Sequence, residues 1–244
     1  DYELSKVLLY LKGFHFYSQV WNDEPPLYPY LLGQIARHGG SSVLMMRWLT
    51  VGLTLLLLGS LFRLALNLGN LRTAVMAVVL VIASPGFLEL ASSCMVEIPT
   101  LAFVVAAFAL LSQRGKYHWP WWEIGAGVLF GLALQMKAIA VIYLPLTVLL
   151  LWLQHRLDLK QLFFSALVIG VMAGLSFLAL NALTGCSLGL QLQQAWTSHF
   201  SGAKSFEYGS PADHGFDWKL LLKNWDALVP LLLGAGILVA RIRS

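Results

Sequence analysis

The sequence has little charge. Asp, Glu, Lys and Arg make up 11% of its 244 residues, whereas soluble domains carry about 25%. Hydrophobic residues make up 58%, and the mean hydropathy is +0.72. These values exclude an ordinary soluble domain and indicate a polytopic membrane protein whose main solvent is the bilayer. The formal net charge of +4 indicates basic cytoplasmic ends rather than a nucleic-acid surface, so no nucleic-acid partner is expected.

Other signals are missing as well. The chain has no internal repeat, no low-complexity tract and no phosphate-binding glycine loop. Only two cysteines occur, Cys94 and Cys186. They allow one disulfide, although two free thiols are the favoured interpretation. The chain begins at Asp1, with no initiator methionine and no signal-like segment, so we expect a fragment that lacks at least one upstream span.

Long apolar runs are present, and they predict an all-α bundle of membrane-spanning helices, because a span needs about 20 apolar residues. We expect one transmembrane domain, divided into an external segment 1–42, a helix bundle 43–183, a second external segment 184–226 and a last span within 227–244. The predicted spans are 43–66, 71–84, 98–113, 122–136, 138–154, 162–183 and 227–240.

Charged loops predict the orientation of these spans, because cytoplasmic loops are rich in Lys and Arg. Basic loops alternate along the chain with acidic ones. The basic loops hold Arg63, Arg72, Arg114, Lys116, His155, Arg156, Lys160, Arg241 and Arg243. The acidic segments hold Asp1, Glu3, Asp23, Glu24, Glu97 and the stretch 184–226. We therefore expect the acidic residues to gather on the external side of the membrane.

Two short helices are predicted beside the membrane rather than across it. In residues 2–12, four apolar side chains follow the i, i+3, i+4, i+7 spacing of a helix face, with the lysines elsewhere. Such a helix lies along the membrane interface. Residues 26–38 form the second helix, with a proline in its first turn. A third interfacial helix is expected within FDWKLLLKNW, residues 216–225.

The acidic residues have an ordinary structural interpretation beside a functional one. Asp1 and Glu3 suit the start of a helix, where carboxylates cap N–H groups and favour the dipole, but either could be a base or a metal ligand. Asp23 and Glu24 suit a solvated turn. The prolines that follow them, however, give both carboxylates a fixed direction, as metal coordination or a positioned hydrogen bond requires.

Glu97 stands at the start of an apolar span, where an ionised side chain needs a partner or a wet cavity. Lys137 lies between two apolar runs on the expected external side. It and Arg47 either snorkel to the interface or bind a phosphate. For His199 and His214 a surface-loop position is favoured, since neither has a metal-ligand spacing.

Four stretches, in order, resemble motifs of one family. Residues 1–32, DYELSKVLLYLKGFHFYSQVWNDEPPLYPYLL, combine an acidic start with a W(N/D)xxPPL(Y/F) turn. LMMRWLTVGL supplies Arg47, SPGFLELASSCMVEIPTLAFVVAAFALL supplies Glu97, and GLALQMKAIAVIYLP supplies Lys137. Over about residues 1–150 the chain resembles the bacterial GT-C glycosyltransferases, relatives of protein O-mannosyltransferases and of the lipid A aminoarabinose transferase.

The resemblance implies a GT-C-like fold and an inverting transfer of a sugar from a polyprenyl-phosphate carrier to a lipid, glycan or protein acceptor. It places the reaction on the periplasmic face of a bacterial inner membrane. It implies catalytic roles for Asp1, Glu3 and Glu97, one of which deprotonates the acceptor. Asp23 and Glu24 then hold a divalent metal or position the acceptor.

The chain departs from the family pattern at three places. Relatives often have an adjacent Asp-Glu pair, where this chain has Asp1-Tyr2-Glu3, and Glu97 stands where relatives often have Asp. Relatives often have Lys before the proline pair, where this chain has Glu24. The lipid-phosphate role is therefore assigned to Lys137 and Arg47. Two other functions remain open, a transporter or channel and a non-catalytic scaffold, although a transporter would place charges near the midplane of inverted repeats.

Overall fold

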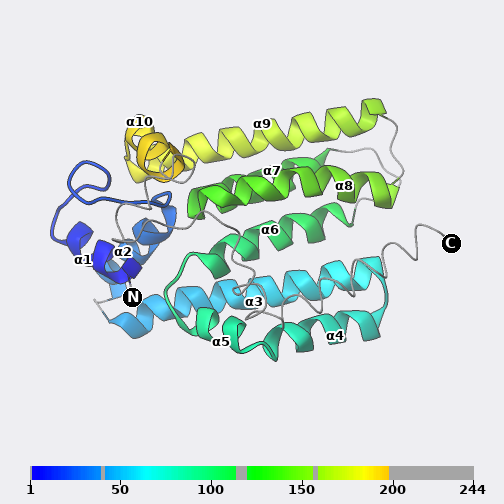
Figure 1. Cartoon of the computed structure of the whole chain (residues 1–244), viewed down its shortest axis with the longest axis horizontal. Coiled ribbons are helices and arrows are strands. Elements are labelled where there is room, and N and C mark those ends of the chain that lie inside the picture. Colours follow the sequence, from blue (N-terminus) through cyan, green and yellow to red (C-terminus); the bar gives the residue numbers. More distant parts are fainter. Residues whose placement is uncertain (1, 40–41, 114–119, 156–158, 198–244) are drawn as a thin grey trace, which may run out of the picture. The chain divides into compact units, whose positions relative to one another are not determined.

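The computed structural model describes residues 2–39, 42–113, 120–155 and 159–197 (Figure 1). Within these ranges the fold is all-α, as predicted, and the only β-type pairing among the described residues is an isolated bridge between Phe16 and Val20. The predicted span 227–240, the interfacial helix 216–225 and most of the segment 184–226 lie outside the described residues.

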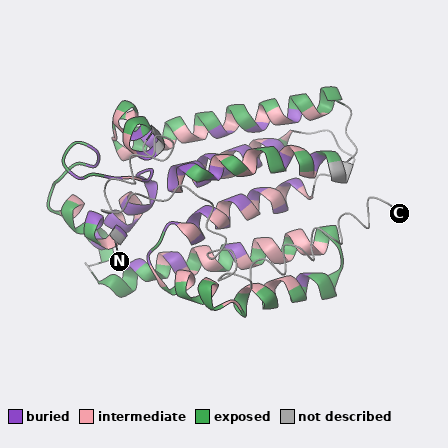
Figure 2. Cartoon of the chain, in the orientation of Figure 1, coloured by how far each residue is buried: buried purple, intermediate pink, exposed green. Residues whose placement is uncertain are grey.

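Two helices are long and apolar enough to cross a membrane by themselves. They are α3 (Val43–Leu68) and α9 (Leu159–Thr184), each of 26 residues, which corresponds to about 39 Å of helix. Both confirm predicted spans. Their outward faces are exposed along most of their length (Figure 2), as expected for helices that contact lipid.

The helix predicted at 71–84 is present, and a second helix follows it after a sharp bend. The chain forms α4 (Leu71–Ile82) and then α5 (Pro85–Ser92), and the two axes differ by 72°. Pro85 causes the break, because a proline excludes the helical conformation from the residue before it. Ser84 is accordingly extended, with φ −76° and ψ 119°. The pair is therefore a broken span or a re-entrant loop, and α5 was not predicted.

The inner helices agree closely with the remaining predictions. They are α6 (Glu97–Leu111), α7 (Trp121–Met136) and α8 (Leu144–His155). The predicted span 138–154 differs in one respect, since its first residues form a 3-10 helix, η1 (Ala138–Tyr143). In Figure 1 the long helices lie side by side in the order α9, α7, α6, α3 and α4, which agrees with their contacts.

Helix α7 packs closely on α9 through two glycines one helical turn apart. A Cβ atom at Gly127 would lie 2.6 Å from the Cβ of Met172, and one at Gly131 would lie 2.5 Å from the Cβ of Ser176. Small residues at this spacing let membrane helices approach each other. Around this contact lies the main apolar core, with Phe130 fully buried, and burial is concentrated on α6 and α7 (Figure 2).

The two short helices predicted beside the membrane are present. They are α1 (Tyr2–Leu11) and α2 (Leu27–Gly39), and they lie at one end of the long helices, together with α10 (Leu188–Gln191) (Figure 1). We call this the α1–α2 end of the bundle. An apolar cluster joins α1 and α2 to the linker before α6 and to the last residue of α7, through Val7, Leu27, Tyr28, Leu32, Cys94, Val96 and Met136.

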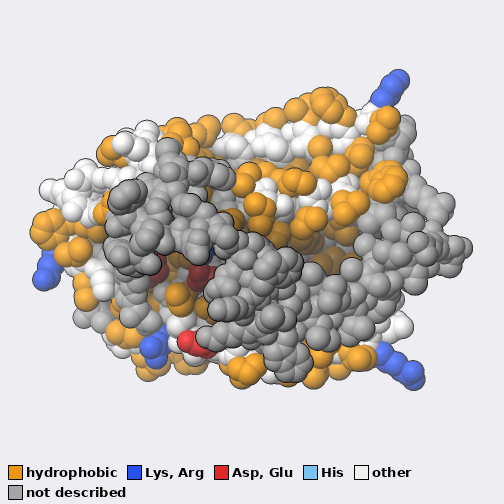
Figure 3. All heavy atoms as spheres, viewed as in Figure 1, with side chains coloured by type: hydrophobic (Ala, Val, Ile, Leu, Met, Phe, Trp, Pro, Cys, Tyr) orange, Lys and Arg blue, Asp and Glu red, His pale blue; other side chains and the backbone are white. Residues whose placement is uncertain are grey.

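The surface agrees with a membrane environment. Hydrophobic side chains cover most of the described bundle in the space-filling view, and the Lys and Arg side chains visible there lie toward its two ends (Figure 3). Many large hydrophobic residues on α3, α4 and α9 are exposed, among them Leu44, Trp48, Met76 and Phe163. Exposed apolar surface of this extent is expected where lipid replaces water.

Candidate active site

The α1–α2 end holds a cavity of about 190 Å³. Its wall is built from four separate segments: helix α1, the turn before α2, the linker and first residue of α6, and the residue after α7. The lining residues are Glu3, Asp23, Glu24, Cys94, Met95, Val96, Glu97 and Lys137. The predicted acidic residues that the structure describes therefore converge on one end of the bundle.

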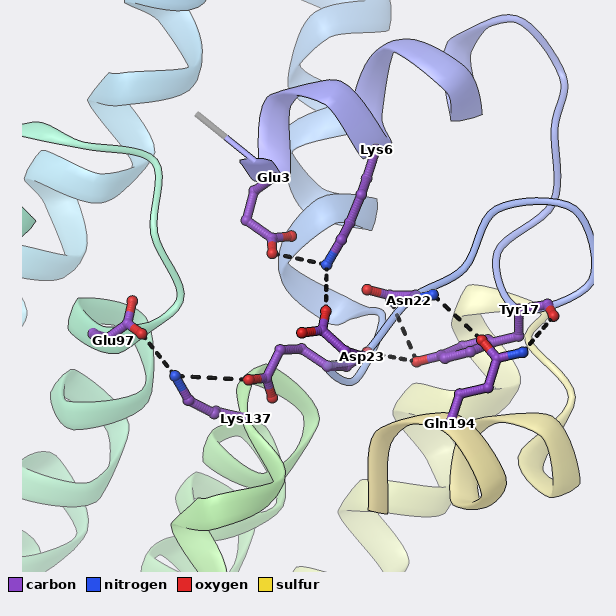
Figure 4. A network of polar contacts seen from close by, with 9 residues as sticks. Glu3, Lys6, Tyr17, Asn22, Asp23, Glu97, Lys137 and Gln194 are labelled. Carbon is purple, nitrogen blue, oxygen red and sulfur yellow. Dashed lines mark hydrogen bonds and ion pairs between the residues drawn. The ribbon is translucent and has the colours of Figure 1, made fainter. Parts of the chain in front are cut away.

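Lys137 stands between two carboxylates of this cavity. Its Nζ lies 2.6 Å from Oε1 of Glu97, to which it donates a hydrogen bond, and 3.6 Å from Oε1 of Glu24 (Figure 4). Helix α7 ends at Met136, and Lys137 directly after it is extended, with φ −149° and ψ 126°. Burial lowers the pKa of Lys137, but the hydrogen bond to Glu97 and the charge of Glu24 outweigh it, so the pKa lies above the usual lysine value.

Lys6 makes the second such arrangement. Its Nζ lies 2.9 Å from Oε1 of Glu3 and 3.0 Å from Oδ1 of Asp23 (Figure 4). Only 3% of the Lys6 side chain is exposed. Helical periodicity places this lysine away from the apolar face of its helix, and no role was predicted for it. The available signal was its spacing, since Glu3 and Lys6 are i and i+3 on one helix and therefore neighbours.

Glu3 is the most unusual carboxylate of the group. It is 6% exposed, and its Oε2 accepts no hydrogen bond from the residues that the structure describes. Burial raises the pKa of Glu3 above the usual value, although the neighbouring Lys6 charge acts in the opposite direction. A buried carboxyl group with a raised pKa and a free oxygen on a cavity wall is suited to accept a proton.

The turn before α2 rests on further buried polar groups that the sequence analysis missed. Asn22 is fully buried, and the Tyr17 hydroxyl donates a 2.8 Å hydrogen bond to the carbonyl of Glu24. Gln194, far along the chain, contacts the same loop (Figure 4). Pro25 and Pro26 are buried directly before α2, and the carbonyl of Pro26 accepts the first helical bond, from Tyr30 at 2.9 Å.

The acidic residues do not form a metal site in the part of the chain that is described. No group of three Asp, Glu, His or Cys side chains there has the arrangement to hold a metal ion. Asp23 and Glu24, the predicted ligands, each have a carboxylate oxygen close to a lysine Nζ. Since a lysine ammonium and a divalent cation would compete for the same oxygens, this arrangement does not fit a metal held by these two residues.

The remaining residues weighed in the sequence are Asp1, Arg47, His199, His214 and the two cysteines. Asp1, His199 and His214 lie outside the described residues. Arg47 is exposed in the first turns of α3 and does not line the cavity. Burial raises the pKa of the Cys94 thiol, and the charge of Arg47 acts in the opposite direction. Cys94 and Cys186 are free thiols, in agreement with the favoured interpretation.

A further buried acid, Glu123, lies at the opposite end of the bundle, in the first turn of α7. It is 3% exposed and accepts a 3.2 Å hydrogen bond from the Ser165 hydroxyl of α9. No role was predicted for Glu123 from the sequence. It lies at the positive end of a helix dipole with a hydroxyl donor beside it, and both favour a carboxylate at this position.

Comparison with known proteins supplies one match. Residues 23–179, more than half of the chain, match the family described as dolichyl-phosphate-mannose-protein mannosyltransferase. No curated protein and no solved structure matches the chain. The matched range includes the Asp23–Glu24 turn, Glu97 and Lys137, whereas Glu3 and Lys6 precede it.

Proposed function

The chain belongs to the dolichyl-phosphate-mannose-protein mannosyltransferase family, and on this premise we propose that it moves a sugar from a polyprenyl-phosphate donor to an acceptor. Membership confirms the resemblance to GT-C enzymes and makes the protein a membrane glycosyltransferase. The proposal adds the lipid-phosphate donor and the side on which the reaction takes place, the periplasmic face of a bacterial inner membrane.

One observation carries the proposal. Lys137 lies between Glu24 and Glu97 on a cavity that also contains Glu3 and Asp23. Cations and carboxylates are thus available within one small space at the end of a membrane bundle. Displacing a lipid phosphate from a sugar requires both, a base for the attacking hydroxyl and positive charge for the leaving phosphate.

The transfer can be written with these groups. The acceptor hydroxyl oxygen attacks C1 of the sugar from the face opposite the phosphate, the C1–O bond to the phosphate breaks, and the configuration at C1 inverts. A carboxylate takes the hydroxyl proton. We assign this role to Glu3 or Glu97, with Asp1 as a further candidate. Both Glu3 and Glu97 have a buried oxygen that accepts no hydrogen bond within the described chain.

The leaving polyprenyl phosphate keeps the electron pair of the broken bond and needs a cation beside it. Lys137 is the candidate on the cavity wall, and its raised pKa keeps it protonated. Arg47 is exposed in the first turns of α3. We assign it to the phosphate of the approaching lipid. Asp23 and Glu24 position the acceptor. Each of them also lies close to a lysine, Asp23 to Lys6 and Glu24 to Lys137.

The experiment uses the full-length protein in sealed vesicles, supplied with radiolabelled polyprenyl-phosphate mannose, glucose or aminoarabinose. Wild type is expected to transfer label from one of these donors. The Glu97→Gln variant is expected to lose about 100-fold in rate, as for removal of a catalytic proton-transfer group. Asp1→Asn tests the residue outside the described chain in the same way.

The matched control is Glu89→Gln, which removes an exposed glutamate of α5 and should retain the wild-type rate. Transfer at the wild-type rate by both Glu97→Gln and Asp1→Asn would remove these two residues from the catalytic assignments and leave Glu3 as the base, which loss of transfer in Glu3→Gln would test. Donor binding without transfer by wild type would favour a non-catalytic scaffold. Chelation with EDTA tests the metal, because a metal-dependent reaction would stop and then resume on addition of Mg²⁺ or Mn²⁺.

A further inference from the structure

The loop that carries Asp23 and Glu24 is hydrogen-bonded to a segment near the end of the described chain. Residues 12–26 connect α1 to α2. Gln194 lies in η2 (Leu192–Thr197), a π-helical segment that directly follows α10. We infer that Gln194, acting through Tyr17 and Asn22, is a positioning residue for the acidic turn of the cavity. This inference rests on the proposed function only where it predicts catalytic rates.

The side-chain amide of Gln194 holds the loop at two points. Its Nε2 donates a 2.8 Å hydrogen bond to the carbonyl of Tyr17, and its Oε1 accepts a 3.3 Å hydrogen bond from the backbone N–H of Asn22 (Figure 4). These two backbone groups lie at either end of residues 17–22, which include the turn at 17–19. One planar amide therefore fixes the separation between them.

Tyr17 is the strained member of this arrangement. Its φ is +67°, and among the described residues it is the only one other than glycine with a positive φ. A bulky side chain is uncommon in that conformation, and it persists only where the surrounding contacts hold it. Here the contacts are the Gln194 amide on its carbonyl and a 2.7 Å hydrogen bond from its own N–H to the carbonyl of Val20.

The Tyr17 side chain contacts the residues on both sides of Asp23. The Tyr17 hydroxyl is buried, accepts a 3.4 Å hydrogen bond from the Asn22 side chain and donates one to the Glu24 carbonyl. The backbone is thus fixed immediately before and after Asp23. With its backbone fixed, Asp23 faces Lys6 and Glu24 faces Lys137.

The form of η2 gives an independent reason to expect a role. A π-helical turn is rare and is frequently found at functional sites. The segment is also anchored, with Gln191 and Ala195 fully buried. Gln194 therefore stands on a fixed base.

The test uses the native Cys94 thiol, which lines the cavity and is fully buried. If the turn loosens, N-ethylmaleimide should reach Cys94 faster, and peptide mass spectrometry separates this label from any on Cys186. In the full-length protein in vesicles, Gln194→Ala is expected to raise the rate of Cys94 labelling about tenfold, as for local opening of a held loop. Gln193→Ala, an exposed glutamine of the same segment, is the matched control.

The second readout is the transfer rate with the donor that wild type accepts. Gln194→Ala is expected to lower kcat about 10- to 100-fold, since small misplacement of catalytic groups has effects of that size, while KM for the donor stays within about twofold. Tyr17→Phe should act in the same direction, because it removes only the hydroxyl that holds Glu24. The double variant should be no slower than the slower single variant, since both act through one turn.

Three results would overturn the inference: unchanged Cys94 labelling in Gln194→Ala, an equal change in Gln193→Ala, or additive effects in the double variant. Failure of the proposed function is recognised separately. If wild type transfers no sugar from any donor, while Gln194→Ala but not Gln193→Ala exposes Cys94, the positioning of the turn stands and the glycosyltransferase assignment of the cavity does not.

Discussion

Helices α6 and α7 each have a glutamate in their first turn, and because the two helices are antiparallel neighbours, these glutamates mark opposite ends of the bundle. Glu97 meets Lys137 on the wall of a cavity. Glu123 meets the hydroxyl of Ser165 in the contact between α7 and α9. The local sequence signal is the same, and the surroundings differ.

The difference shows what makes a buried carboxylate a candidate for chemistry. Both glutamates lie at a helix start, whose dipole favours a carboxylate, and Glu123 also accepts a hydrogen bond from a hydroxyl of α9. Glu97 shares a lysine with a second carboxylate, Glu24, that comes from another part of the chain. Several charges of both signs around one cavity are what distinguish a candidate site from a capped helix.

The strongest test of this comparison removes the shared cation. In Lys137→Met, the carboxylates of Glu24 and Glu97 would face the cavity without the lysine between them, and the leaving phosphate would lose its nearest cation. We expect transfer to fall about 1,000-fold, the upper range for removal of one transition-state donor. The measurement is single-turnover transfer of labelled sugar in vesicles.

The control for this prediction is Lys137→Arg, which keeps the charge and should retain more of the activity than Lys137→Met. Size-exclusion chromatography in detergent checks that both variants fold. If Lys137→Met folds and transfers sugar at the wild-type rate, transfer does not need this cation. The Lys137 contact would then not distinguish Glu97 from Glu123 as a candidate for chemistry.

The second test concerns the helix that links the two ends. Gly131 has no room for a larger side chain, because its Cβ position is occupied by Ser176 of α9. Gly131→Val should therefore separate α7 from α9 and lower the free energy of unfolding by about 1–3 kcal/mol, as for other overpacked cores. Thermal unfolding in detergent measures this. Gly170→Val is the control, since no neighbouring atom occupies its Cβ position.

A smaller effect is expected at the opposite end. Glu123→Gln keeps an acceptor for Ser165 and lies at the far end of α7 from Lys137. Because distant sites act independently, transfer should stay within about threefold of wild type. A large loss of transfer, measured beside Glu97→Gln in the same vesicles, would contradict the proposed contrast between the two glutamates.

The smallest effect is on the pH dependence of stability. Burial raises the pKa of Glu3 in the folded protein, so the folded state binds this proton more tightly than the unfolded state. Glu3 therefore lowers stability progressively as the pH rises from the ordinary glutamate value through the raised one, and the loss is complete above it. Glu3→Gln should remove this slope. Chemical denaturation at several pH values measures it, and an unchanged slope would contradict the raised pKa.

Hydropathy predicted most of the bundle correctly, because a span's position depends on composition over about 20 residues. The short helices are what it did not predict. Pro85 breaks the run that begins at Leu71 and lets a separate helix follow. Similarly, α10 and the π-helical segment after it fall in a stretch that is neither apolar enough for a span nor marked by a known motif.

At the cavity, the alternation of charged loops was enough to predict that Glu3, Glu24 and Glu97 gather at one end, with Lys137 among them. It could not predict the partners. Lys6 is buried although helical periodicity placed it away from the apolar face. The contact of Gln194 with Tyr17 joins residues 177 positions apart, and no local pattern encodes a pair at that separation.

The order of synthesis gives the shared lysine a further consequence. A chain is made from its N-terminus and its early parts begin to fold first, so the turn before α2 and the start of α6 are made before the end of α7 exists. Until Lys137 emerges, Glu24 and Glu97 lack the ammonium that joins them. Closure of the pocket wall is therefore a late event in biogenesis, set by when α7 completes its passage rather than by the segments that carry the acids.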